Sequence, residues 1–130
     1  MKETIQLTAH FQVSPSEIFH AWLDSKKHSE MTGGTAECSN KEGETFSAWD
    51  GYITGKNKSL VLNKEIIQDW RTTEFKDSDE DSELIIRLTP KDGGCELTLT
   101  HNNIPKGQPD YKKGWVEHYF EPMTEYFENK

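Results

Sequence analysis

The feature that most constrains the fold is the C-terminal stretch GWVEHYFEPMTEYFENK, which begins at Gly114. At about 100° per residue, its large apolar side chains fall within one arc of about 140°, and polar side chains fill the opposite arc. This segregation predicts an amphipathic helix that lies across an apolar surface. Pro122 has no N–H to donate to the carbonyl of His118, so we expect the helix to bend there. The apolar arc contains Trp115, Val116, Tyr119, Phe120, Met123, Tyr126 and Phe127.

The composition predicts one folded domain, spanning residues 1–130, with a thin core and a charged surface. Hydrophobic residues make up 32% of the chain and charged residues 29%, a balance that by itself favours disorder. Aromatic residues at 11%, together with regular apolar periodicity, favour a folded domain instead. The net charge of −8 opposes binding to nucleic acid or to an anionic membrane surface.

The chain shows neither a signal peptide nor an apolar run of membrane-spanning length. Its two cysteines, Cys38 and Cys95, lie far apart and outside any metal-binding or redox spacing, which favours two reduced, buried thiols. We therefore expect a cytoplasmic protein that does not attach to a membrane.

The N-terminal part of the chain predicts one strand followed by two short helices. Apolar residues alternate along 4–13, as in a half-buried strand. Ser14, Pro15 and Glu17 then form a helix start with a capping box, and the helix they begin should break near residue 24. A second short helix is expected through residues 26–31, ended by the pair of glycines that follows.

From residue 35 to Pro105 the signals are those of strands and turns. In the last hairpin, the apolar side chains of both strands and His101 point to one face, and an acidic loop at 76–82 precedes it. We predict an α+β fold in which the C-terminal helix covers the inner face of a curved antiparallel sheet of about six or seven strands. The expected strands are 35–39, two short strands within 44–55 on either side of Asp50-Gly51, one centred on 66–71, and a hairpin of 83–90 with 95–105.

Five stretches, in this order and spacing, resemble the family of activators of heat-shock-protein-90 ATPase in its C-terminal-domain or stand-alone form. The resemblance implies a helix-grip fold, as in START lipid-transfer domains and the birch-pollen allergen, in which helix and sheet usually enclose a cavity for an apolar ligand. It also implies an alternative, a partner that binds and stimulates a heat-shock-protein-90 homologue. The stretches are SPSEIFHAW (14–22), WDGYITG (49–55), EIIQDWR (65–71), HNNIP (101–105) and GWVEHYF (114–120).

The sequence departs from the eukaryotic co-chaperones of this family in one respect. Those proteins carry a separate N-terminal domain that makes much of the contact with the chaperone, whereas this chain starts at the helix-grip unit. The family also shares no catalytic set that could be transferred to this chain. The resemblance therefore implies a fold more strongly than a function.

The aromatic stripe of the C-terminal helix has two interpretations that the sequence leaves open. Its side chains either fill the core or line a pocket for a small apolar or aromatic molecule. In the second case His101 would orient the ligand, with Trp70 opposite it. The candidate lining residues are Phe46, Trp70, His101, Trp115, Tyr119 and Met123.

Metal and catalytic sites find little support. The five histidines lack paired metal-ligand spacing, and no cofactor fingerprint or catalytic motif is present. The acidic loop imitates the start of a calcium loop, but Ser82 and Leu88 stand where that loop requires its glycine and its bidentate glutamate. We expect a non-enzymatic protein without metal or cofactor; a cyclase or hydrolase of the same superfamily is the remaining alternative.

Overall fold

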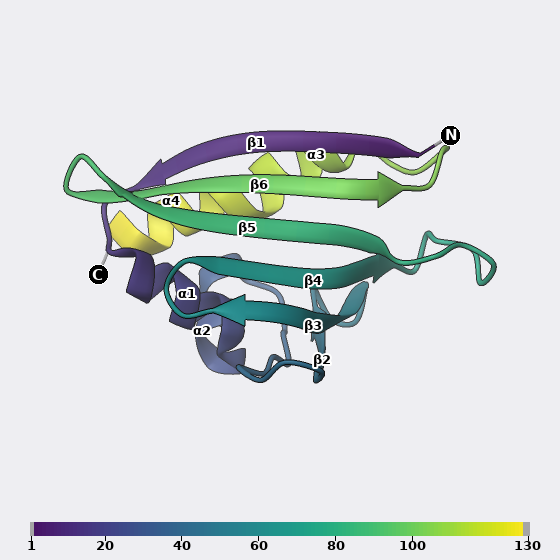
Figure 1. Cartoon of the computed structure of the whole chain (residues 1–130), viewed down its shortest axis with the longest axis horizontal. Helices are drawn as coiled ribbons and strands as arrows, with labels where there is room; N and C mark the ends of the chain where they lie inside the picture. Colours follow the sequence, from purple (N-terminus) through teal and green to yellow (C-terminus); the bar gives the residue numbers. More distant parts are fainter. Residues whose placement is uncertain (1, 129–130) are drawn as a thin grey trace.

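The strands form one six-stranded antiparallel sheet in the order β1-β6-β5-β4-β3-β2 (Figure 1). The structure, a computed structural model, describes residues 2–128, so residues 129 and 130 of the predicted amphipathic stretch lie outside the described residues. The first strand pairs with the last one, which brings the two halves of the chain together. The strands are β1 (Glu3–Phe11), β2 (Thr45–Ala48), β3 (Ile53–Val61), β4 (Glu65–Thr72), β5 (Ser82–Lys91) and β6 (Gly94–Ile104).

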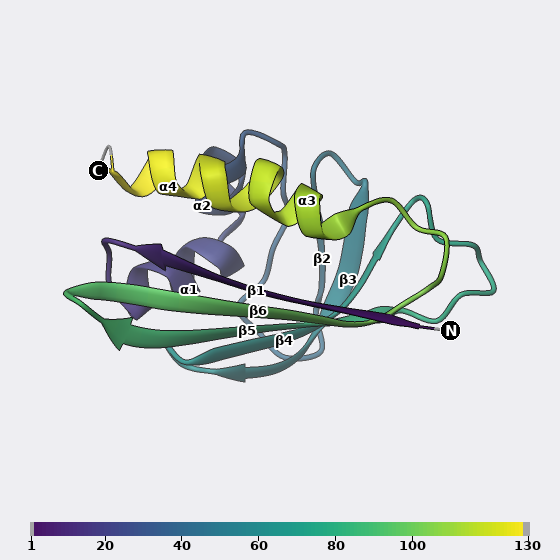
Figure 2. The ribbon, with the colours of Figure 1, turned by 90° about the horizontal axis from the view of Figure 1, so that it is seen from above.

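All helices lie on one face of this sheet (Figure 2). The helix α1 (Pro15–Leu23) begins as predicted, because the side chain of Ser14 accepts a hydrogen bond from the backbone N–H of Glu17. The helix α2 (Ser25–Thr32) ends at Gly33, whose φ of 89° few other residues tolerate. The C-terminal helix consists of α3 (Tyr111–Trp115), η1 (Val116–Phe120) and α4 (Glu121–Glu128). The predicted α+β fold, with a long helix laid across the sheet, is confirmed.

The irregularity expected near Pro122 takes the form of a π-helical turn, η1, immediately before it. The backbone N–H of Glu121 donates to the carbonyl of Val116, five residues earlier. An α-helix cannot satisfy the carbonyl of His118 in the usual way, because Pro122 lacks a donor. Widening the preceding turn to a π-helical one allows the helix to continue past Pro122.

The strand predicted at residues 35–39 is wrong. This segment makes only an isolated bridge between Glu37 and Ser47. The neighbouring backbone N–H groups are taken by α2, because Ala36 donates to Ser29 Oγ at 2.8 Å and Cys38 donates to Ser25 Oγ at 2.8 Å. Because the N–H groups on both sides of Glu37 already donate to side chains of α2, the single bridge at Glu37 cannot extend into the hydrogen-bond ladder of a strand.

The second strand of the pair expected within 44–55 is much longer than predicted. It does not end at Gly55 but runs on to Val61 as β3. Gly55 serves close packing within the strand, since a Cβ there would lie 1.9 Å from the carbonyl oxygen of Asp69 and 2.6 Å from the ring of Phe46. A register shift between Asn57 and Ser59 bends this strand.

The core lies between the inner face of the sheet and the helices. The predicted hairpin is confirmed: in β5 and β6, Leu84 pairs with His101 and Ile86 with Leu99. These four side chains are fully buried, as is Met123 of α4 above them. Within residues 2–128 we find no helix that is both long enough and apolar enough to span a membrane.

Candidate functional site

A cavity of about 540 Å³ opens between the first turns of the C-terminal helix and the β2–β3 end of the sheet. Pockets for small molecules are commonly of this size and are predominantly apolar with a few polar groups. The charged residues at the cavity are exposed and form its rim. The aromatic residues that line it are Trp49, Tyr52, Trp70, Tyr111, Trp115 and Tyr119.

The floor of the cavity is a continuous aromatic cluster. The ring of Trp115 lies with its centroid 5.5 Å from that of Trp70 and 4.9 Å from that of Tyr119. Tyr111 packs edge-on against Trp70 at 5.2 Å. These four side chains are almost completely buried, so each is at once part of the core and part of the cavity wall. The two interpretations of the aromatic stripe are therefore not exclusive for these residues.

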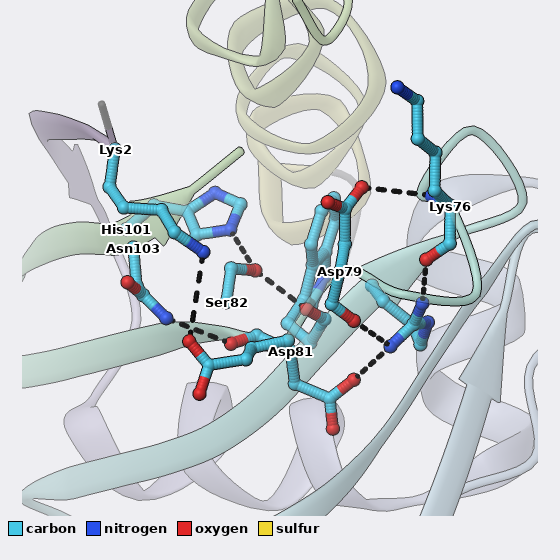
Figure 3. A network of polar contacts seen from close by, with 10 residues as sticks. Lys2, Lys76, Asp79, Asp81, Ser82, His101 and Asn103 are labelled. Atoms are coloured by element: carbon cyan, nitrogen blue, oxygen red, sulfur yellow. Dashed lines mark hydrogen bonds and ion pairs between the residues drawn. The ribbon is translucent and has the colours of Figure 1, made fainter. Parts of the chain in front are cut away.

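A buried chain of hydrogen bonds runs beneath this floor through His101. The indole N–H of Trp115 donates to His101 Nδ1 at 3.1 Å. Ser82 Oγ donates to the carbonyl oxygen of Trp70 at 2.6 Å, so at 2.8 Å it accepts from His101 Nε2 (Figure 3). Because Nδ1 accepts and Nε2 donates, His101 is the neutral tautomer with its proton on Nε2.

Both nitrogens of His101 are therefore used within the core. Burial lowers the pKa of His101 to about 3, because the charged imidazolium would lose its hydration there. A second proton on Nδ1 would also face the indole N–H of Trp115. His101 is a structural hydrogen-bonding residue in this state, and it does not line the cavity.

A second histidine, His28 of α2, is buried beside Tyr119. His28 Nδ1 donates to the carbonyl of Trp22 at 2.8 Å, and Nε2 accepts from the Tyr119 hydroxyl at 2.9 Å. Burial lowers the pKa of His28 and raises that of Tyr119. The partner that a buried Tyr119 hydroxyl requires is thus supplied by α2 rather than by a ligand.

Trp49 forms a separate wall of the cavity, and its placement is strained. Its φ is 50°, and Asp50 follows with a φ of 59°, in the left-handed region that non-glycine residues seldom occupy. Its ring packs edge-on against His118 at 5.5 Å and fills the space above Gly34, where a Cβ would lie 2.5 Å from it. Its buried indole N–H has no hydrogen-bond partner among the described residues. Strain of this kind is concentrated at functional sites.

The structure brings only some of the predicted lining residues to the cavity. Trp70, Trp115 and Tyr119 line it. Met123 is fully buried further along the helix, and Phe46 covers Gly55 in the sheet. The rings of Trp70 and His101 are in contact, with centroids 4.5 Å apart, but only Trp70 lines the cavity.

Sequence reasoning missed three aromatic residues of the cavity. Trp49 and Tyr52 flank the turn at Asp50-Gly51, and Tyr111 begins the C-terminal helix. Aromatic side chains beside a tight turn, or at the first position of a helix, carry no periodic signal. The dense aromatic content of WDGY was the one available hint.

The acidic loop between β4 and β5 is organised by a cation of the chain itself. Arg71 forms an ion pair with Asp81 at 2.7 Å and donates to the carbonyl oxygens of Asp79 and Lys76. Asp79 in turn accepts from the backbone N–H of Lys76 (Figure 3). The guanidinium thus pairs with the carboxylate of Asp81, one of the three aspartates of the calcium-like spacing, and binds two backbone carbonyls of the loop. Within residues 2–128, no group of three or more potential metal ligands is found.

A second hollow, of about 880 Å³, lies between the α1–α2 turn and the β3–β4 hairpin. It is larger but much more polar, with Asp24, Lys26, Lys27 and Glu44 along it. Because ligand sites are mostly apolar with few polar groups, the aromatic cavity is the better candidate.

Comparison with known proteins places this geometry in context. Residues 12–128 match the protein family described as "Activator of Hsp90 ATPase homolog 1-like protein". Human activator of 90 kDa heat shock protein ATPase homolog 1 is 29% identical over 126 residues, which cover 95% of this chain and 36% of the human protein. The chain thus spans about a third of the length of this relative.

Two solved structures have the same fold. An HSP90 activator from Plasmodium falciparum superposes with a TM-score of 0.81 at 25% identity, covering 91% of each chain. The Aha1 dimer from Colwellia psychrerythraea superposes with a TM-score of 0.81 at 16% identity, covering 97% of this chain and 96% of that one. At such low identity the second likeness concerns the fold alone.

Proposed function

The chain belongs to the family of activator of Hsp90 ATPase homolog 1-like proteins, and from this premise we propose that it binds a small apolar or aromatic molecule between its sheet and its C-terminal helix. The observation that carries this proposal is the aromatic cavity of about 540 Å³ at the start of that helix. A ligand there would bury its surface against indole and phenol rings, which contribute large apolar areas.

The buried hydrogen-bonding groups beside the cavity are committed to the core, which leaves His118 and the charged residues of the rim as the ionisable groups open to a ligand. The two buried histidines nearest to it, His28 and His101, use both ring nitrogens in internal hydrogen bonds. Neither has a free nitrogen with which to accept or donate a proton during a reaction. The hydroxyl of Tyr111 is likewise shared between Thr72 and Gln108. These buried groups therefore do not support general acid–base work, which needs a group that can exchange a proton with a substrate.

Gly114 offers a direct test of the cavity. It lines the cavity, and a Cβ built there meets no atom within 4 Å. Gly114→Leu should therefore place a bulky side chain in the ligand space, whereas Gly114→Ala adds one methyl group and leaves most of that space free. We expect N-phenyl-1-naphthylamine, a neutral aromatic probe, to become fluorescent with the original chain and with Gly114→Ala but not with Gly114→Leu.

Circular dichroism and thermal unfolding establish that both variants are folded before the probe is added. Native mass spectrometry of chain purified gently from cells should also show an extra mass that disappears on denaturation, and Gly114→Leu should lack it. A folded Gly114→Leu variant that binds the probe as well as the original chain would exclude this cavity as the binding site.

A second function is favoured by the comparisons: a partner that stimulates the ATPase of a heat-shock-protein-90 homologue. The human relative is named an activator of the 90 kDa heat shock protein ATPase, and the Plasmodium protein is described as an HSP90 activator. The test is to mix the chain with the homologue from the same organism and to measure ATP hydrolysis. An unchanged hydrolysis rate over a range of chain concentrations would contradict this role. A folded Gly114→Leu variant that no longer binds the probe but still stimulates ATP hydrolysis would show that the two functions use different surfaces.

A further inference from the structure

We propose that the ligand of the aromatic cavity is an organic cation, an ammonium group carried on an apolar body. This inference rests on the binding function proposed above and adds the chemical class of the ligand. It follows from what surrounds the cavity: indole and phenol rings form its walls, and carboxylates outnumber cations at its rim.

The walls present the kind of surface that attracts a desolvated cation. Three indole rings and three phenol rings line the cavity, and no aliphatic side chain other than Ile53 and Pro109 does so. The negative face of an aromatic ring attracts an ammonium group within about 6 Å of its centre, and indole does so most strongly. A purely apolar ligand would be served equally well by leucine and valine, so the abundance of rings favours a charged ligand.

The rim carries an excess of negative charge. Glu74, Asp110 and Glu117 are the carboxylates at the cavity, and Lys113 is the one lysine or arginine there. Lys113 lies 4.0 Å from Glu117, in an exposed pair of the kind that contributes little and restrains neither group strongly.

Glu74 is oriented toward the aromatic wall and is available to a cation. Its Oε2 accepts a hydrogen bond from the Tyr52 hydroxyl at 3.4 Å, which connects the carboxylate to a wall residue. Within the described part of the chain, Glu74 forms no ion pair with a lysine, arginine or histidine. An ammonium ligand between the rings and this carboxylate would supply the missing counter-charge.

An anionic ligand fits this site poorly. The start of the C-terminal helix, which would otherwise attract an anion, is already capped, because Asp110 accepts from the backbone N–H of Lys113 at 3.1 Å. A net charge of −8 on the whole chain further opposes the approach of an anion and favours that of a cation.

The experiment compares choline with its uncharged carbon isostere, 3,3-dimethylbutan-1-ol, at low ionic strength. Binding is followed by NMR through the indole N–H signals, which four tryptophans supply. Trp49, Trp70 and Trp115 line the cavity, whereas Trp22 packs behind it against Trp115 and Tyr119, so its signal should shift less than theirs. We expect choline to shift the lining signals and to bind about tenfold more tightly than the isostere.

Matched variants test the origin of this preference. Glu74→Gln combined with Glu117→Gln should reduce the preference for choline to less than about twofold, because two of the three rim carboxylates are neutralised and the third, Asp110, is kept as the helix cap. Glu30→Gln combined with Glu125→Gln removes the same charge from exposed positions that do not line the cavity, and should leave the preference unchanged.

The outcomes separate this inference from the function on which it rests. If the alcohol binds as tightly as choline, the cavity binds apolar molecules without regard to charge, which overturns the inference and leaves the function standing. If both pairs of variants lose the preference equally, the effect comes from net charge and not from the rim, which also overturns it. If neither compound shifts the lining signals while N-phenyl-1-naphthylamine binds, the inference fails alone; if that probe also fails, both are overturned.

Discussion

The two ends of the C-terminal helix lie over the same sheet but in different surroundings. At the closed end, from Phe120 to Phe127, α2 contacts α4, and Phe11 of β1 packs edge-on against both phenylalanines, at 6.3 Å and 6.0 Å. At the open end, from Tyr111 to Trp115, Trp22 of α1 stacks on Trp115 at 6.3 Å and Trp70 of the sheet contacts both rings, and both rings also line the cavity. The closed end is core, and the open end borders the cavity.

This contrast shows that an apolar helix face does not determine what it is buried against. Met123 and Trp115 lie on the same arc of the helix, and both are almost completely buried. Yet only Trp115 of the two lines a cavity, because α1 and α2 lie nearer to the α4 end of the helix than to its start (Figure 2), and Trp22 of α1 contacts Trp115 without closing the cavity. The predictions below test this difference, beginning with the largest expected effect.

The sharpest test compares alanine substitutions at the two ends. Trp115→Ala should lower the free energy of unfolding by about 3–5 kcal/mol, because it removes a large buried ring and leaves His101 Nδ1 without its donor. Met123→Ala should lower it by about 2–5 kcal/mol. Urea denaturation gives both values, and probe fluorescence should then fall only for Trp115→Ala. Equal loss of probe binding in both variants would contradict the contrast between the ends.

Acid should destabilise the protein before its carboxylates are protonated. The folded pKa of His101 is about 3, below the value of about 6.5 for an unfolded chain. Below pH 6.5 the unfolded chain therefore binds a proton that the folded chain refuses, and stability falls as pH decreases toward 3. His28 acts in the same direction, since its pKa is also lowered.

His101 contributes a slope of up to about 1.4 kcal/mol per pH unit, or about 2 kcal/mol between pH 6.5 and 5. Urea denaturation across this range measures the slope. His101→Gln cannot take up a proton and should retain only the part of the slope that His28 supplies. A stability that stays constant from pH 7 to pH 5 would show that His101 is not held neutral by the core.

Removal of one hydroxyl from each of two cavity-lining tyrosines should distinguish a buried partner from an exposed one. Tyr119→Phe leaves Nε2 of the buried His28 without a donor and should cost about 1–3 kcal/mol. Tyr52→Phe removes only a long, exposed bond to Glu74 and should cost less than about 0.5 kcal/mol. Thermal unfolding of the two variants is the measurement, and similar losses would mean that the two hydroxyls are equally accessible to water.

The smallest expected effect is a gain. Gly114→Ala should stabilise the protein by about 0.5–1 kcal/mol, because alanine favours the helix and its methyl group enters open space. Gly34→Ala is the contrasting change, since its methyl group would collide with the ring of Trp49. A loss of stability in Gly114→Ala would show that the open end is filled more tightly than the structure indicates.

Much of the fold could be predicted from the sequence, because its signals are local. The capping residues Ser14 and Gly33, the 84–99 hairpin and the amphipathic helix each carry their own pattern. The strand predicted at 35–39 does not form, because serine side chains of α2 occupy the backbone N–H groups of Ala36 and Cys38. Half of the candidate lining residues could be found because the helix face identifies Trp115 and Tyr119, and the strand face identifies Trp70.

The sequence by itself determined which side chains of the last helix face inward and that a curved antiparallel sheet lies beneath them, since periodicity and turn chemistry act over a few residues. Only the tertiary structure decided where along that helix the space is filled. Whether a ring becomes core or cavity wall depends on what lies opposite it, and here that is set by α1, α2 and the strained turn at Trp49. Those neighbours come from elsewhere in the chain, so no local pattern in the helix can encode them.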